Sequence, residues 1–160
     1  MTWCCWYEYI SSASNTLRYL MSEGRDSAIS GFTLEAHNGY LWTHSPNNTV
    51  QTSVALTDGW HHCCAVLDES TVKIYLDGEL RGALNSSAAI TYSESDNPKL
   101  VIGKMSYGYT SESSYFTAAG AISDARIYKS ALSAADVKTL FETSMEIDSS
   151  GNILPRVLTS

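Results

Sequence analysis

The stretch from Asp58 to Arg81 limits the possible folds more than any other part of the chain, because it predicts three consecutive β-strands. Apolar side chains alternate with the others from position 72 to 76, a period of two that is typical of a strand with one buried face. Two Asp-Gly pairs, at positions 58–59 and 77–78, bound these strands. Such pairs close hairpins because glycine adopts a positive φ without steric cost, so we expect antiparallel β structure.

The same stretch carries a family resemblance. Gly-Trp-His-His at 59–62 precedes a short apolar strand, and Lys-Ile-Tyr-Leu-Asp-Gly follows at 73–78. A second block begins with Gly-Ala-Ile-Ser-Asp at 120–124, continues to Tyr128, and is followed by a short segment at 131–136. Over most of its length the chain resembles the laminin-G-like, concanavalin A-like jelly-roll family. The resemblance implies an all-β fold, an antiparallel β-sandwich jelly roll with one short C-terminal helix.

Length and charge narrow the possible partners. With 160 residues, the chain is expected to form one jelly-roll domain over 1–143 and a C-terminal extended tail or hairpin over 144–160. The net charge is -7 and no cluster of Lys or Arg occurs, which argues against nucleic acid as a partner. No apolar run approaches the roughly 18 residues of a membrane span.

The N-terminus and the cysteines bear on where the chain is made. Met1 opens directly on apolar residues without a basic segment, so we expect synthesis without a signal peptide. The four cysteines form two vicinal pairs, at 4–5 and 63–64. Neighbours on a strand point to opposite faces, so neither pair is a Cys-x-x-Cys site. We interpret them as small apolar residues, some buried and reduced, which favours a reducing cytoplasm.

Two segments predict how the ends of the domain are arranged. Residues 3–10 are apolar on both faces apart from Glu8, as in a central strand, yet family members usually have a strand before it. An open sheet edge is therefore expected there. Ser133 and Asp136 form a predicted helix-capping box, with Leu132 and Val137 as its hydrophobic staple.

The tail should fill the role of the missing strand. Residues 146–154 are typical of a hairpin around Ser-Gly-Asn at 150–152. We expect residues 145–158 to be extended and to pair either with the open edge of their own sheet or with a neighbouring subunit. The second arrangement would make the protein a homo-oligomer. Pro155 cannot donate a ladder hydrogen bond and limits such a strand to an edge.

The sequence argues against catalysis. Family members that hydrolyse glycans carry Glu-x-Asp-x-x-Glu on one strand, which aligns two carboxylates for acid and nucleophile roles. Glu-x-Asp occurs at 94–96 and 146–148, but the third acid is missing from both. We therefore expect a protein that is not an enzyme. His61 and His62 match a structural family motif and point to opposite faces.

A metal site has one candidate ligand. Related glycanases hold Ca²⁺ with an aspartate that precedes a Val-Arg-Val-Tyr-like strand, and Asp124 stands before Ala-Arg-Ile-Tyr. The resemblance therefore implies that Asp124 could bind Ca²⁺ through its carboxylate. The alternative is an ion pair with Arg126, because residues i and i+2 share a face of a strand.

Glycan binding requires aromatic side chains beside polar groups that bond to sugar hydroxyls. Trp42 and three tyrosines of a Ser/Tyr/Gly-rich segment, Tyr107, Tyr109 and Tyr115, are the candidate ligand-binding residues. Alternatively, Trp42 belongs to the core, and the tyrosines are ordinary loop residues or contact another protein.

The function predicted from these observations is a lectin-like module. It would bind a glycan or cell-surface polysaccharide and be displayed on a virion, such as a phage tail or capsid surface, or on another large assembly. The alternative is a purely structural domain whose loops bind protein neighbours. A glycoside hydrolase is the third interpretation, and it lacks the catalytic motif.

Overall fold

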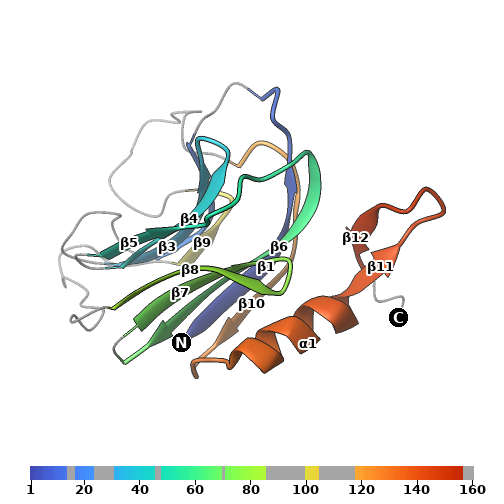
Figure 1. Ribbon diagram of the computed structural model, residues 1–160. Coiled ribbons are helices and arrows are strands. Elements are labelled where there is room, and N and C mark those ends of the chain that lie inside the picture. Colours follow the sequence, from blue (N-terminus) through green and yellow to red (C-terminus); the bar gives the residue numbers. More distant parts are fainter. Residues whose placement is uncertain are drawn as a thin grey trace.

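The alternating segments assemble into two five-stranded antiparallel sheets that pack face to face (Figure 1). The computed structural model describes residues 1–13, 17–23, 31–45, 48–69, 71–85, 100–104 and 118–156. In that part of the chain the sheets are accompanied by one helix, α1 (Ala134–Ser144), and a small hairpin of two strands. The predicted β-sandwich jelly roll with a short C-terminal helix is confirmed.

Each sheet has its own strand order. The helix-side sheet, which α1 covers, has the order β10-β1-β6-β7-β8. Its strands are β10 (Ile122–Tyr128), β1 (Thr2–Tyr9), β6 (Gly59–Asp68), β7 (Thr71–Leu76) and β8 (Glu79–Asn85). The far sheet has the order β5-β4-β3-β2-β9. Its strands are β5 (Asn48–Gln51), β4 (Tyr40–Ser45), β3 (Phe32–His37), β2 (Leu17–Glu23) and β9 (Leu100–Ile102).

Strand β1 is buried on both faces, which explains its continuous apolar sequence. Trp3, Cys5 and Tyr7 lie in the core between the sheets, whereas Cys4 belongs to a second apolar cluster under the helix. The strand pairs with β10 on one side and β6 on the other. The expectation of an open edge at β1 is therefore wrong, because a strand more than a hundred residues later in the chain occupies that edge.

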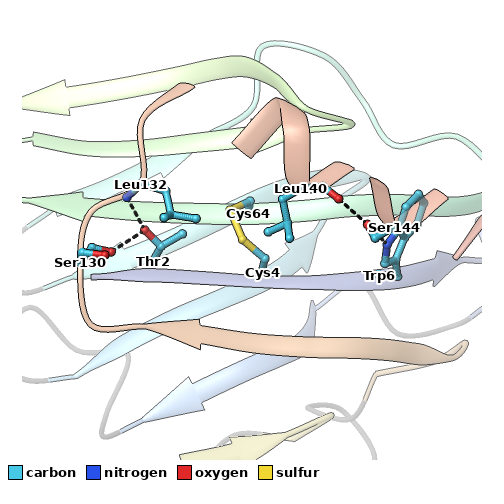
Figure 2. Close-up of a disulfide and its surroundings, with 8 residues drawn as sticks. All are labelled: Thr2, Cys4, Trp6, Cys64, Ser130, Leu132, Leu140 and Ser144. Carbon is cyan, nitrogen blue, oxygen red and sulfur yellow. Dashed lines mark hydrogen bonds between the residues drawn. A yellow bond between two sulfur atoms is a disulfide. The ribbon is translucent and has the colours of Figure 1, made fainter. Parts of the chain in front are cut away.

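Helix α1 begins as the sequence predicts and lies on the outer face of the helix-side sheet (Figure 2). The Ser133 hydroxyl accepts from the Asp136 amide, and the Asp136 carboxylate accepts from the Ser133 amide, completing the capping box. Val137 is fully buried against the sheet, with Leu132 packed beside it. Capping and burial together hold this short helix in place.

A disulfide under the helix joins Cys4 of β1 to Cys64 of β6, which are direct partners across the two strands (Figure 2). The interpretation of the cysteines as reduced apolar residues is wrong for this pair, because two positions 60 residues apart face each other. It holds for Cys5 and Cys63, which are buried and free on the core face. Burial raises the pKa of Cys5 to about 12, so its thiol stays protonated.

The two Asp-Gly pairs have different roles. Asp77 and Gly78, with φ of 52° and 78°, close the two-residue turn between β7 and β8 as predicted. Asp58 and Gly59 do not close a hairpin. Strand β5 pairs with β4 in the far sheet, whereas β6 belongs to the helix-side sheet, so the segment before β6 crosses from one sheet to the other.

The tail forms its own hairpin beyond the helix (Figure 1). Strands β11 (Met145–Ile147) and β12 (Ile153–Pro155) pair with each other around Gly151, as the Ser-Gly-Asn turn predicts. The expected pairing with an edge of its own sheet does not occur within the described residues, and pairing with a neighbouring subunit stays a prediction. In the described part of the chain, no helix has the length and apolarity needed to cross a membrane.

Candidate functional site

A cleft of about 570 Å³ opens where the C-terminal hairpin lies against the helix-side sheet. Four segments of the chain form its walls: the end of β1, residues 57–61 at the start of β6, Asp77 in the turn between β7 and β8, and the hairpin residues 151–154. The cleft begins where the helix ends. Ser144, the last helical residue, accepts a hydrogen bond of 3.0 Å from the Trp6 indole (Figure 2).

Glu8 and Trp60 are the central pair of the cleft. They are direct partners on β1 and β6, so their side chains lie next to each other on one face of the sheet. Both are partly exposed and line the cleft. Among the described residues, neither the Glu8 carboxylate nor the Trp60 indole N–H has a hydrogen-bond partner. A partly exposed ring therefore stands beside a free acceptor and has a free donor of its own.

Asp58 and Asp77 line the cleft with carboxylates that the protein itself holds in place. The Asp58 oxygens accept from the Ser11 amide at 2.5 Å and from its hydroxyl at 3.0 Å. These bonds lower the pKa of Asp58 below its usual value. The Asp77 oxygens accept from the His62 amide and lie 2.8 Å from Nδ1 of His61. Hydrogen bonds from the protein thus hold both carboxylates in place.

His61 and His62 show how one strand gives neighbours opposite environments. The two ring nitrogens of His61 lie 2.8 Å from the Asp77 carboxylate and 2.9 Å from the Thr57 carbonyl, two acceptors that suit a protonated ring. Burial is the largest single influence and lowers the pKa of His61, but the hydrogen bond and the charge of Asp77 together with the Thr57 carbonyl outweigh it, so the net change is upward. His62 packs against Trp6 and Phe141, and burial lowers its pKa to about 4.

The hairpin contributes an ordered amide to the rim of the cleft. Asp148 accepts hydrogen bonds from the backbone of Ser150 and Asn152, and from the Asn152 side chain at 2.8 Å. These bonds fix the turn and the orientation of Asn152. The cleft therefore combines an aromatic ring, a free carboxylate and an amide, the groups that bind the apolar faces and hydroxyls of sugars.

Trp42, the aromatic residue predicted to bind ligand, lies elsewhere. It is on the outer face of the far sheet, half-buried, so it does not belong to the core. Its indole N–H donates to the His37 carbonyl at 3.1 Å. The His37 and His44 rings flank it at 5.6 and 6.1 Å, and we call these three rings the Trp42 strip. Beside it, Glu35 is buried and accepts from His44 at 3.0 Å.

The other predicted site residues have different outcomes. Tyr107, Tyr109 and Tyr115 lie outside the described residues. Asp124 forms the ion pair that was the alternative to a metal: its two oxygens bond to Nη2 and Nε of Arg126, each at 2.7 Å. In the described ranges, no group of three or more His, Cys, Asp or Glu side chains could hold a metal ion. Calcium binding by Asp124 stays a prediction.

Sequence reasoning missed the cleft although it noted two of its residues. In the sequence, Trp60 belongs to the Trp-His-His of a structural family motif, and Glu8 is the one polar residue of an apolar strand. A lone carboxylate in a central strand was the available signal, since burial without a partner is costly. Asn152 gave no signal, because only the folded tail brings it to the cleft.

Comparisons with known proteins agree with this fold. The family model described as "Concanavalin A-like lectin/glucanases superfamily" matches residues 1–138. No curated protein matches the chain. Among solved structures, the CBM40 module of a Ruminococcus gnavus IT-sialidase has a TM-score of 0.64 at 16% identity, covering 88% of this chain and 81% of that one. The same module has been solved with α2,3-sialyllactose, again at 16% identity over 88% and 81% of the chains, with a TM-score of 0.62.

Two further solved structures show the same architecture. A heptameric SAP-like pentraxin from Limulus polyphemus has a TM-score of 0.65 at 18% identity, with 88% of this chain and 68% of that one covered. The binding domain of botulinum neurotoxin serotype D has a TM-score of 0.65 at 15% identity, with 96% and 39% covered. At these identities the likeness shows a shared fold.

Proposed function

Because the chain belongs to the concanavalin A-like lectin/glucanase superfamily, we propose that it is a non-enzymatic, lectin-like module that binds glycan in the cleft beside the C-terminal hairpin. The single observation that carries this proposal is the Glu8–Trp60 pair, a partly exposed ring next to a carboxylate with no partner among the described residues. Support comes from the structurally similar module whose title names bound sialyllactose.

The cleft has the chemistry that sugar recognition uses. The apolar C–H face of a pyranose packs on an aromatic ring, while its hydroxyls both donate and accept hydrogen bonds. The Trp60 ring and its indole N–H, the Glu8 carboxylate and the Asn152 amide provide all of these partners within one cavity. A volume of about 570 Å³ lies within the usual range for small-ligand sites.

A glycan array followed by calorimetry tests the proposal. The array identifies glycans that bind, and titration of the best of them compares Trp60→Ala with Trp42→Ala. We expect Trp60→Ala to weaken binding about tenfold or more, as truncation of a central aromatic residue does, and Trp42→Ala to change it little. No binding by any glycan, or a loss confined to Trp42→Ala, contradicts the cleft as the site.

A structural role is the second candidate, and one observation favours it. Ile147 and Ile153 are direct partners on the hairpin and are 63% and 40% exposed. An apolar pair in this position is suited to contact with a protein neighbour. We propose that the hairpin attaches the module to a large assembly, such as a virion, or to a second copy of the chain. Light scattering of the wild type and of an Ile147→Asp/Ile153→Asp variant tests self-association, which should be lost in the variant.

We propose that the chain is made in a reducing cytoplasm and displayed on a virion. The Cys4–Cys64 disulfide would then form after or during assembly, because cytosolic thiols are kept reduced. Thiol labelling of protein purified directly from the producing cells under acid quench measures how much of this pair is already oxidised. A fully oxidised pair would favour an oxidising compartment instead.

A further inference from the structure

We propose that the cleft selects glycans with a protonated amine, as in an amino sugar without its acetyl group, over neutral and anionic glycans. This inference rests on the proposed glycan binding at the same cleft. It adds the chemical class of the sugar, which neither the fold nor the structural neighbours assign.

The charged side chains that line the cleft are mainly acidic. Carboxylates from Glu8, Asp58 and Asp77 line the cleft, and no lysine or arginine occurs among its described lining residues. Among the described lining residues, the only side chain that can become cationic is His61, which pairs with Asp77; outside the lining, the charge of Arg18 acts on Asp58. Even with His61 protonated, three carboxylates face one positive charge. The chain as a whole is also acidic, with a net charge of -7. The local field therefore favours a cationic ligand.

The second step identifies the carboxylate that would meet the ligand. Asp58 is engaged by Ser11, and Asp77 by the two histidines of β6. Glu8 has no such partner among the described residues, so its oxygens are free to accept from an amine. A bond between an ammonium group and a carboxylate is charge-assisted and stronger than one between neutral groups.

The third step concerns the ring beside Glu8. Trp60 is its direct partner on the next strand, and the face of an indole attracts cations. A sugar that packs on this ring brings a substituent of its pyranose within reach of the Glu8 carboxylate. A protonated amine at that position interacts with the carboxylate and the ring together, whereas an N-acetyl group keeps the hydrogen bond and loses the charge.

The same lining disfavours acidic sugars. A sialic acid or uronic acid would bring a further carboxylate into a cleft that already has three, and like charges repel at this range. The expected preference therefore differs from that of the Ruminococcus gnavus module, which has been solved with sialyllactose at 16% identity to this chain. The two share a fold, and we infer that the charge of the site separates their ligands.

Calorimetry with three matched probes tests the inference. The trimer of glucosamine, the trimer of N-acetylglucosamine and α2,3-sialyllactose are titrated into the wild-type chain at about pH 6, where the amine is protonated. We expect the glucosamine trimer to bind about fivefold or more tighter than the acetylated trimer at low salt, with sialyllactose weakest. The advantage should shrink in high salt, because screening weakens exposed charge pairs.

Two variants test whether the preference for the amine depends on Glu8. Glu8→Gln keeps the shape and a hydrogen-bond acceptor but removes the charge, so it should abolish the preference for the amine while both trimers still bind. Glu69→Gln removes the same charge from the turn at the opposite end of β6, and it should leave the preference intact. Equal melting temperatures of the two variants exclude a folding defect as the cause.

The outcomes separate this inference from the proposed function. Tighter binding of the glucosamine trimer that Glu8→Gln abolishes supports the inference. Equal affinity for both trimers, or tightest binding of sialyllactose, overturns it and leaves glycan binding in place. If none of the three probes nor any glycan on the array binds, the proposed function itself fails, and the inference fails with it.

Discussion

The cleft and the Trp42 strip are both aromatic surfaces, but they differ in whether the hydrogen-bond donors and acceptors beside the ring already have partners. In the strip the indole N–H is bonded to His37, and Glu35 is bonded to His44. In the cleft the Trp60 indole and the Glu8 carboxylate have no partner among the described residues. We therefore expect a ligand to bind in the cleft, where the donor and acceptor beside the ring remain free, rather than on the strip, where they are already bonded.

The two regions also differ in how they are built. The strip comes from two adjacent strands of one sheet, β3 and β4, joined by a short turn. The cleft needs β1, β6 and the C-terminal hairpin, which meet only in the folded chain. The disulfide between β1 and β6 lies on the same face of the sheet as the cleft, so the cleft should depend on long-range structure more than the strip does.

Removal of the disulfide should cause the largest loss of stability, and it should disturb the cleft more than the Trp42 strip. We expect Cys4→Ala/Cys64→Ala to lower the free energy of unfolding by about 3 kcal/mol and to weaken glycan binding, because β1 and β6 carry Glu8 and Trp60. Urea unfolding and calorimetry measure the two effects. The control is Cys5→Ala/Cys63→Ala, which removes two buried free thiols one register away. A control that loses as much stability would show that packing, not the crosslink, is responsible.

Lowering the pH should reduce the free energy of unfolding, because His62 is buried under the helix. Burial lowers the pKa of His62 from 6.5 to about 4, so the folded state resists protonation in that interval. The free energy of unfolding is therefore unaffected by His62 above about pH 6.5. It falls as the pH drops toward 4, by on the order of 3 kcal/mol in all. Chemical unfolding between these pH values should show a smaller loss of stability in His62→Phe than in the wild type. Parallel pH profiles of the two proteins would contradict this assignment.

His61 should change the free energy of unfolding with pH in the opposite direction to His62. Burial lowers its pKa, but the hydrogen bond and the charge of Asp77 together with the Thr57 carbonyl give a net rise. His61 therefore stabilises the folded state below pH 6.5, and this contribution is lost as the pH rises through the higher value. An Asp77→Asn variant should therefore lose more stability near pH 6 than near pH 9. Equal losses at both values would show that the bond does not depend on the charge of the ring.

Substitution of Asn152, the amide at the rim of the cleft, should have a smaller effect, and only on glycan binding. Asn152→Ala removes the tie to Asp148 and the amide at the cleft, and we expect affinity for the glycan to fall a few-fold, about 1 kcal/mol for a neutral hydrogen bond. Asn85→Ala, at an exposed position on β8, is the matched control and should bind as the wild type does. If both variants bind equally well, the hairpin is only a wall of the cleft.

The smallest effect is expected at Asp124, outside both regions. Its partly exposed ion pair with Arg126 should contribute about 0.5 kcal/mol, which Asp124→Asn would remove. Millimolar Ca²⁺ should leave the melting temperature of the wild type unchanged. A rise with Ca²⁺ that disappears in Asp124→Asn would instead show that this carboxylate binds the metal, because a ligand of the native state raises its stability.

Much of the fold could be predicted from local patterns. The alternation in β7, the Asp77-Gly78 turn and the capping box at Ser133 each follow from residues within a few positions of one another. Period, positive φ and side-chain capping are local properties, so the sequence alone is sufficient to predict them.

Only the tertiary structure decided what lies beside each of these elements. The vicinal cysteines predict one thiol on each face of β1, but the partner of Cys4 depends on the register between β1 and β6. The edge expected to be open is covered by β10, and Glu8 meets Trp60 and the hairpin through contacts that span most of the chain. Side-chain periodicity determines which face a residue takes, whereas the neighbours on that face depend on which distant strands pair, and at what register.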